Sequence, residues 1–166
     1  MAKRSNFAGT VKCMQRQDIE IQPYRDSFKE QMVSIWEKSV RATHDFLTPA
    51  DVDYYKSIVV KIDFSFFQVF CLTQGENVLG FIGIADNKIE MLFLSPEHIG
   101  QGLGKTLVNF AVNTLKADKV DVNEQNYNAV RFYSKFGFVP YDRTEKDSEG
   151  KDFPILKMRL GDARQL

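Results

Sequence analysis

The chain has 166 residues, a length typical of a single domain, and 43% of them are hydrophobic, enough to build a core. Lysine and arginine together number 22, as do aspartate and glutamate, so the basic excess of nucleic-acid-binding proteins is missing. The two cysteines, Cys13 and Cys71, are too few for a disulfide scaffold or a zinc site, and no apolar run approaches the ~20 residues that span a membrane. We therefore expect no metal, no nucleic-acid or membrane partner, and a reducing, cytoplasmic environment.

Apolar spacing divides the chain into strands and helices between two short ends. Residues 1–17 carry only basic charges and no periodicity, so we expect a leader there, one domain over 18–160, and a tail over 161–166. Thr48 followed by proline marks a helix start, and Gly137 marks a helix end. In chain order the predicted elements are a strand over 18–24, helices over 27–40 and 50–59, strands over 67–72, 78–85 and 89–94, a helix over 103–115, a strand over 119–123, a helix over 126–136, and a hairpin over 138–143 and 153–159.

The most distinctive segment joins the strand over 89–94 to the following helix through three alternating glycines, Gly100, Gly102 and Gly104. A strand, a glycine-rich loop and a helix start together turn backbone N–H groups toward a bound phosphate. The helix start adds about half a positive charge, and glycine lets the backbone approach the ligand closely. The segment therefore predicts a site for a phosphorylated cofactor.

Two common phosphate loops are excluded by position. The Walker loop needs a glycine five positions before Gly104, and Ile99 stands there. The dinucleotide fingerprint needs a third glycine where this chain has Lys105 or Leu107. The loop and the helix remain, so the spacing points to another kind of cofactor.

The spacing resembles the acetyl-CoA loop of the GNAT superfamily of N-acetyltransferases, Arg/Gln-x-x-Gly-x-Gly/Ala. The loop here reads Ile99-Gly100-Gln101-Gly102-Leu103-Gly104, with Ile99 in place of the family's Arg or Gln. A segment over 122–138 resembles the family's Asn-x-x-Ala-x-x-Phe-Tyr-x-Lys-x-Gly-Phe motif. Residues 36–47 resemble a group of small bacterial GNAT proteins that includes peptidyl-lysine acetyltransferases, and the whole resemblance covers about 18–160.

The resemblance implies the GNAT fold, in the α/β (α+β) class, with a mixed, largely antiparallel sheet and helices on both faces. It also implies acetyl-CoA as a cosubstrate that is bound mainly by main-chain amides. The residues that it places at this cofactor are Phe93, Leu94, Ile99, Gly100, Gln101, Gly102, Leu103, Gly104, Lys105, Thr106, Asn126 and Tyr133.

Acetyl transfer to an amine needs a neutral amine, a polarised carbonyl and a protonated leaving thiolate. Deprotonating a lysine amine at pH 7 costs about 4.6 kcal/mol, so a lysine acceptor favours a base. Glu90 is the candidate base, and strand alternation would place it on a different face from Met91 and Phe93; a paired surface carboxylate is the alternative. Tyr133 matches the family tyrosine that protonates the CoA thiolate, and a core aromatic is the alternative.

Three further features allow both a functional and a structural interpretation. His44, after the first helix, is a candidate for substrate binding or proton relay, although a lone histidine is more often structural. Asn126 matches a family asparagine that contacts pantetheine or a site water, and it is equally a favoured helix N-cap. The acidic turn around Asp147 and Glu149 faces either a cationic acceptor or solvent alone.

We therefore predict a single-domain, acetyl-CoA-dependent N-acetyltransferase, monomeric or homodimeric, that acts by direct transfer in a ternary complex. Backbone N–H groups of the strand over 89–94 are expected to polarise the carbonyl. The acceptor, a primary amine, is left open between a protein lysine and a small molecule. Two alternatives are a non-catalytic acyl-CoA sensor and an unrelated nucleotide-binding α/β protein.

Overall fold

The structure is a computed structural model that describes residues 18–161; the predicted leader and residues 162–166 of the predicted tail lie outside the described residues. The strands are β1 (Ile19–Pro23), β2 (Gln68–Gln74), β3 (Asn77–Ala85), β4 (Lys88–Leu94), β5 (Lys119–Asn123), β6 (Phe138–Thr144) and β7 (Ile155–Leu160). The helices are α1 (Lys29–Thr43), α2 (Pro49–Val59), α3 (Leu103–Asn113) and α4 (Tyr127–Lys135), with short 3-10 helices η2 (Asp26–Phe28), η3 (Phe64–Phe66) and η4 (Pro96–His98). The order of strands and α-helices along the chain is the predicted one.

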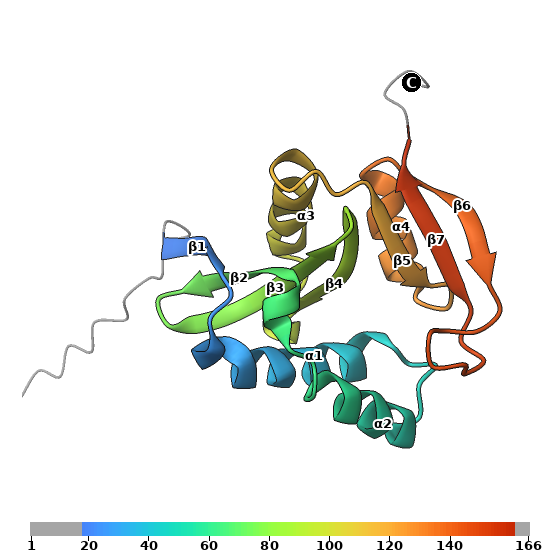
Figure 1. Cartoon of the computed structure of the whole chain (residues 1–166), viewed down its shortest axis with the longest axis horizontal. Coiled ribbons are helices and arrows are strands. Elements are labelled where there is room, and N and C mark those ends of the chain that lie inside the picture. Colours follow the sequence, from blue (N-terminus) through green and yellow to red (C-terminus); the bar gives the residue numbers. More distant parts are fainter. Residues whose placement is uncertain (1–17, 162–166) are drawn as a thin grey trace, which may run out of the picture.

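The strands form one mixed sheet in the order β1-β2-β3-β4-β5-β7-β6 (Figure 1). All neighbouring strands are antiparallel except β4 and β5, which are parallel, so the predicted largely antiparallel sheet is confirmed. The predicted terminal hairpin also forms. Its second strand, β7, lies inside the sheet between β5 and β6, and β6 becomes the edge.

The sheet parts between its two parallel strands. β4 pairs with β5 only at Lys88, opposite Lys119, and at Ile89, opposite Val120. Beyond these residues the two strands diverge, as the ribbons show (Figure 1). The remaining length of β4 therefore has no strand beside it on its β5 side, and a wedge opens there.

Helices cover both faces of the sheet, as predicted. α1 and α2 lie on one face, while α3 and α4 lie on the other (Figure 1). The alternation of β3 sorts its side chains between these layers: Phe81 joins a core with α1 and α2, and Ile82 joins a core with α3 and α4. Each helix thus buries one apolar stripe, and its polar face stays in solvent.

Helix α2 begins at the predicted signal. The Thr48 hydroxyl accepts a hydrogen bond from the backbone N–H of Asp51 at 3.2 Å, and the Asp51 carboxylate accepts one from the Thr48 backbone N–H at 3.1 Å. This reciprocal capping box, with Pro49 in the first turn, satisfies two N–H groups that have no partner inside the helix.

Helix α3 ends at Asn113, two residues before the predicted end. The chain reverses at Lys116, whose φ of 60° is left-handed, and the Ala117 N–H bonds back to the Ala111 carbonyl at 2.9 Å. The apolar pattern continues through Leu115 because that side chain still packs on the core outside the helix.

Candidate active site

The loop between β4 and α3 takes backbone angles that favour glycine at two positions. Gly100 has a φ of 83°, and Gly102, the N-cap of α3, has a φ of 85°. That region costs other residues about 1–2 kcal/mol. A Cβ at either position would meet no heavy atom within 4 Å, so the space beside the loop is open. No side chain caps α3, and its first N–H groups are free to bind an anionic group.

Gly104 is needed for close packing instead. A Cβ there would lie 3.3 Å from Phe132 Cζ and 3.5 Å from Leu94 Cδ1. Glycine therefore lets α3 lie close to α4 and to the end of β4. The contact fixes the position of the loop that precedes α3.

A cavity of about 400 Å³, here called the loop cavity, opens beside these glycines. Predicted cofactor residues on its walls are Phe93, Leu94, Ile99, Gly100, Gly102, Gly104, Lys105, Asn126 and Tyr133. Wall residues that were not predicted for the cofactor are Ser39, Thr43, His44, Leu92, Asn128, Ala129 and Phe132. The polar glycine loop lies along a mostly apolar wall, which suits a ligand with a charged end and a long uncharged arm.

Three predicted cofactor residues lie off these walls. The Gln101 side-chain amide donates to a backbone carbonyl in η4 at 2.8 Å, and the Thr106 hydroxyl donates to the Gly102 carbonyl at 3.3 Å. Leu103 packs against the core on the α3–α4 face. Helix geometry explains the positions of Leu103 and Thr106, because successive residues of α3 point in different directions around its axis.

Asn126 is both a helix N-cap and a residue of the cavity walls. It is the N-cap of α4, and its side-chain oxygen accepts a hydrogen bond from the Ala129 N–H at 3.1 Å. The same residue lines the loop cavity and a second cavity of about 200 Å³ in the wedge between β4 and β5, the wedge cavity. The capping bond fixes its position at the border of the two cavities.

Tyr133 lies on the buried face of α4 and lines both of these cavities. Its ring packs edge-on against Phe132, with centroids 5.2 Å apart, and against Phe138 at 5.7 Å. Burial raises the pKa of the Tyr133 hydroxyl, so the phenol keeps its proton throughout the neutral range. The side chain is thus a core aromatic whose ring also borders the site.

Glu90 occupies a β-bulge in β4, so simple alternation does not set its direction. The register with β3 passes directly from Ile89 to Met91, and these two side chains consequently join cores on opposite faces. Glu90 is one of the residues that line the wedge cavity, and its carboxylate forms an ion pair with Lys88 at 3.1 Å. Glu90 is therefore both a paired carboxylate and a residue of the cavity wall.

His44 follows α1 directly and borders three cavities. It lines the loop cavity, the wedge cavity and a third cavity of about 220 Å³ between α1, α2 and the β6–β7 loop, the outer cavity. Its ring packs against Phe46, with centroids 5.4 Å apart. Burial lowers the pKa of His44, and the opposing charge of Asp45 offsets this only in part.

The outer cavity has aromatic and aliphatic walls with a few polar groups. Its apolar residues are Trp36, Val40, Leu47, Phe93, Phe153 and Ile155. Its polar and titratable residues besides His44 are Tyr55, Asn123, Asp147 and Ser148. Nothing in the local sequence pattern indicates this cavity, because its walls come from four separate parts of the chain.

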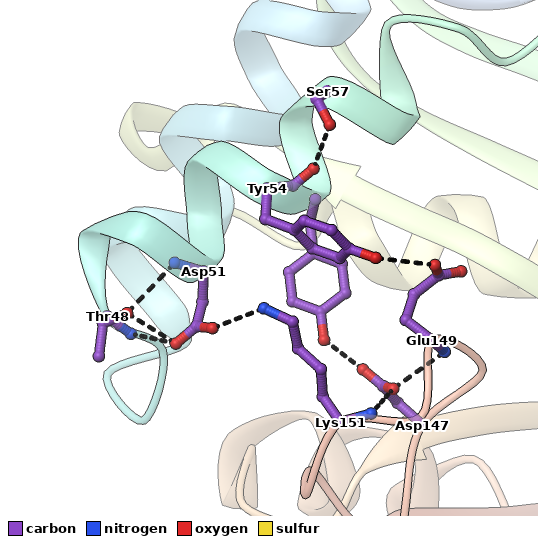
Figure 2. A network of polar contacts seen from close by, with 8 residues as sticks. Thr48, Asp51, Tyr54, Ser57, Asp147, Glu149 and Lys151 are labelled. Atoms are coloured by element: carbon purple, nitrogen blue, oxygen red, sulfur yellow. Dashed lines mark hydrogen bonds and ion pairs between the residues drawn. The ribbon is translucent and has the colours of Figure 1, made fainter.

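Polar contacts hold the β6–β7 loop against α2, and we call this set the α2–loop clamp (Figure 2). Its pairs are Asp51 with Lys151 at 2.8 Å, Tyr54 with Glu149 at 3.2 Å, and Tyr55 with Asp147. Lys151 Nζ also lies 4.2 Å from the centre of the Tyr54 ring. The acidic turn is therefore more than a solvated loop, because it closes one side of the outer cavity.

Three further observations bear on the chemistry available. Among residues 18–161, no three His, Cys, Asp or Glu side chains gather closely enough to hold a metal ion. None of the helices in that range is long and apolar enough to cross a bilayer. Cys71 is buried, and burial raises the pKa of its thiol to about 12, so it is a poor nucleophile at neutral pH; Cys13 lies outside the described residues.

Comparison with known proteins identifies the architecture. A family model for the acetyltransferase (GNAT) domain matches residues 28–161. The chain is 35% identical over 144 residues to the peptidyl-lysine N-acetyltransferase YjaB of Salmonella typhimurium, covering 84% of this chain and 97% of that protein. The solution structure of apo YjaB from Escherichia coli superposes with a TM-score of 0.76 at 31% identity, covering 86% of this chain and 97% of that one.

A more distant structure shares the fold. The PaiA N-acetyltransferase from Thermoplasma acidophilum, solved in complex with coenzyme A, superposes with a TM-score of 0.65 at 21% identity, covering 85% of this chain and 98% of that one. The family match spans most of the chain and includes the glycine loop, β4 and α4. This excludes an unrelated nucleotide-binding protein. The chain belongs to the GNAT family of acetyltransferases.

Proposed function

We propose that this acetyl-CoA-dependent N-acetyltransferase transfers the acetyl group to the side-chain amine of a lysine in another protein. The observation that carries the proposal is the junction of the three cavities, which share His44 and Phe93 as wall residues. A thioester that enters along the loop cavity and an amine that enters through the outer cavity meet beside β4. Direct transfer in a ternary complex then needs no covalent carrier on the protein.

The loop cavity suits the chemistry of acetyl-CoA. The uncapped start of α3 and the open glycines offer N–H groups to the pyrophosphate, and Lys105 adds a positive charge beside them. Leu92 and Phe132 give the pantetheine arm an apolar wall. Because β4 has no partner on its β5 side beyond Ile89, its backbone groups on that side are available to bind the arm and to stabilise the oxyanion of the transition state.

The outer cavity suits a lysine side chain. A lysine combines an apolar four-carbon stem with a cationic end, and the cavity combines aromatic walls such as Trp36 and Phe153 with the carboxylate of Asp147. The name of the Salmonella relative, a peptidyl-lysine N-acetyltransferase, supports the same acceptor. A small-molecule amine is the competing acceptor, and the experiment below separates the two.

Tyr133 is the group that we assign to the leaving thiolate. Its hydroxyl is kept protonated by burial, and the thiolate that forms in the same apolar surroundings is desolvated as well, which makes it a stronger base. Glu90 and His44 are the two predicted residues on the walls that can take a proton from the amine.

We also propose a cytoplasmic location and a monomeric or homodimeric state. The free, buried thiol of Cys71 is compatible with a reducing compartment. The same compartment would supply both acetyl-CoA and protein acceptors.

The test compares acceptors directly. Purified protein and acetyl-CoA are incubated with lysine peptides, with spermidine or with free amino acids, and released thiol and acetylated products are measured. We expect the highest kcat/KM for peptide lysines. Tyr133→Phe should lower kcat about 100-fold with little change in the Kd for CoA, while Tyr141→Phe, an exposed tyrosine on β6, should keep full activity.

The outcomes separate the alternatives. Efficient acetylation of spermidine but not of peptides would overturn the protein-lysine acceptor. If the protein binds acetyl-CoA but releases no thiol with any of the amines, it is an acyl-CoA sensor and not an enzyme. Full activity in Tyr133→Phe would leave Tyr133 as a core aromatic only.

A further inference from the structure

We propose that His44 is the general base of this acetyl transfer, and that Thr43 positions its imidazole with Nε2 free to accept the proton. The inference rests on the proposed function, because it assigns the base to the junction where the acceptor amine meets the thioester. It also gives a role to a histidine for which the sequence predicted only substrate binding or proton relay.

Position is the first argument. Among the described residues, His44 and Phe93 alone line the loop, wedge and outer cavities together, and only the histidine can take up a proton. His44 caps the C-terminus of α1, where its N–H donates to the Val40 carbonyl at 2.9 Å. The backbone therefore fixes the ring at the junction, and Phe46 supports one side of it.

The hydrogen bonds of Thr43 are the second argument. A hydroxyl has one proton to donate, and the Thr43 hydroxyl lies 2.7 Å from the Ser39 backbone carbonyl, which can only accept. Its second contact, 2.8 Å from His44 Nδ1, is then made by the imidazole N–H as donor. This assignment of the hydrogen-bond network puts the proton on Nδ1 and leaves a lone pair on Nε2.

Charge is the third argument. Burial lowers the pKa of His44 from 6.5, so the ring is neutral at pH 7 and its lone pair is available. Asp45 lies beside it, and the other titratable and charged groups on the walls of the same cavities are Tyr55 on α2, Glu90 on β4, Lys105 on α3, Asp121 on β5, Tyr133 on α4 and Asp147 in the β6–β7 loop. The carboxylate of Asp45 favours the imidazolium once a proton arrives.

Glu90 is less suited to this step. Its carboxylate is engaged with Lys88 at 3.1 Å, and the same ammonium bonds Asp121 at 2.9 Å. Glu90 lines the wedge cavity but is not on the walls of the outer cavity, through which the amine enters. The carboxylate would have to leave its ion pair before it could serve as the base.

The proton balance is simple. The acceptor ammonium loses one proton to His44 Nε2, which later releases it to water, and the neutral amine attacks the thioester carbonyl carbon. The N–C bond forms, the C–S bond breaks, and the electron pair of that bond goes to the CoA sulfur. The sulfur takes the hydroxyl proton of Tyr133, and the second proton from the nitrogen restores the phenol. The products are the acetamide, free CoA and one proton.

The kinetic test uses matched histidine variants. His44→Gln should lower kcat/KM for a lysine peptide about 100-fold while CoA affinity is kept, and it should remove the inflection by which the rate falls as pH drops below 6.5. Thr43→Val should give a smaller loss and move that inflection, because Nδ1 loses its partner. His98→Gln, at the chain's other histidine, should match the wild type; His98 lies in η4 and off the walls of the three cavities.

Two measurements keep the test decisive. Added imidazole should restore part of the activity of His44→Ala, which a merely structural role would not allow. The nitrogen chemical shifts of the His44 ring, measured in wild-type protein without any acceptor, should show the proton on Nδ1. The proposal would be overturned if His44→Gln kept the full rate and the inflection, or if Glu90→Gln lost the inflection instead. A proton on Nε2 would overturn it as well. If no lysine peptide is acetylated but the chemical shifts do show the proton on Nδ1, the result would contradict the proposed acceptor and not the state of the His44 ring.

Discussion

Replacement of Gly102 by alanine gives the sharpest test of the phosphate end of the site. The residue holds a φ of 85° at the start of α3, where an L-residue costs about 1–2 kcal/mol. A Cβ would touch nothing within 4 Å, so no contact forces the variant to keep that angle. The loop of Gly102→Ala should therefore relax in the free protein and turn its N–H groups away from the ligand.

The magnitude follows from the same cost. CoA binding would have to restore the left-handed angle, so the 1–2 kcal/mol appears as lost affinity, and the Kd for CoA should rise about 5–30-fold. Gly102→Asn should lose less, because asparagine enters this region more readily. Ile99→Ala should lose less as well, since Ile99 is 46% exposed and its side chain contributes no N–H group.

Calorimetric titration of CoA measures the effect, and Gly75 supplies a matched control. Gly75 has a φ of 58° in the β2–β3 turn, away from the loop cavity, and a Cβ there also meets nothing within 4 Å. Gly75→Ala should therefore carry the same kind of backbone cost without a change in affinity. Unchanged affinity in Gly102→Ala, or an equal loss in Gly75→Ala, would refute the reasoning.

Two further predictions concern stability and reactivity. The hydrogen bonds from Lys151 and then Thr48 lower the pKa of Asp51 from 3.8 to about 2, so this contribution to stability is present above pH 4 and is lost as pH falls toward 2. Urea unfolding across that range should show Asp51→Asn less stable than the wild type at pH 6, with the gap closing toward pH 2; a constant gap would contradict the pairing. In a Cys13→Ser background, Cys71 should resist a thiol reagent at pH 8 until the protein is denatured, and rapid labelling of the native protein would contradict its burial.

Local patterns predicted most of the elements, because they reflect which side of each element is buried. The capping box at Thr48 and the glycine loop were predicted because their chemistry lies within a few adjacent residues. The early end of α3 was not, since Leu115 stays apolar for packing after the helix has stopped. A pattern of burial therefore predicts which residues face the core better than it predicts where a helix ends.

Features that depend on distant residues could not be predicted in this way. The bulge at Glu90 arises from the register of β4 with β3, and it places Ile89 and Met91 in cores on opposite faces of the sheet. The pair of Asp51 and Lys151 joins residues 100 positions apart, so the α2–loop clamp has no local signal. Wall residues such as Phe132 look like ordinary core residues, because a cavity wall and a core share the same apolar pattern.

The two register pairs between β4 and β5 have a consequence for how the molecule holds together. They are the only register pairs between β4 and β5, and the Asn87 carbonyl beside them accepts hydrogen bonds from the N–H groups of Asp118 at 2.8 Å and Lys119 at 3.3 Å. β1–β4 and β5–β7 are therefore two parts of the sheet that are joined over a short stretch. A ligand in the wedge cavity would touch both parts, because residues of β4 and β5 line that cavity, and it would supply contacts that strand pairing supplies in a continuous sheet. We therefore expect binding of the cosubstrate to stabilise the junction between the two parts of the sheet, so that the stability of the fold rises with substrate occupancy.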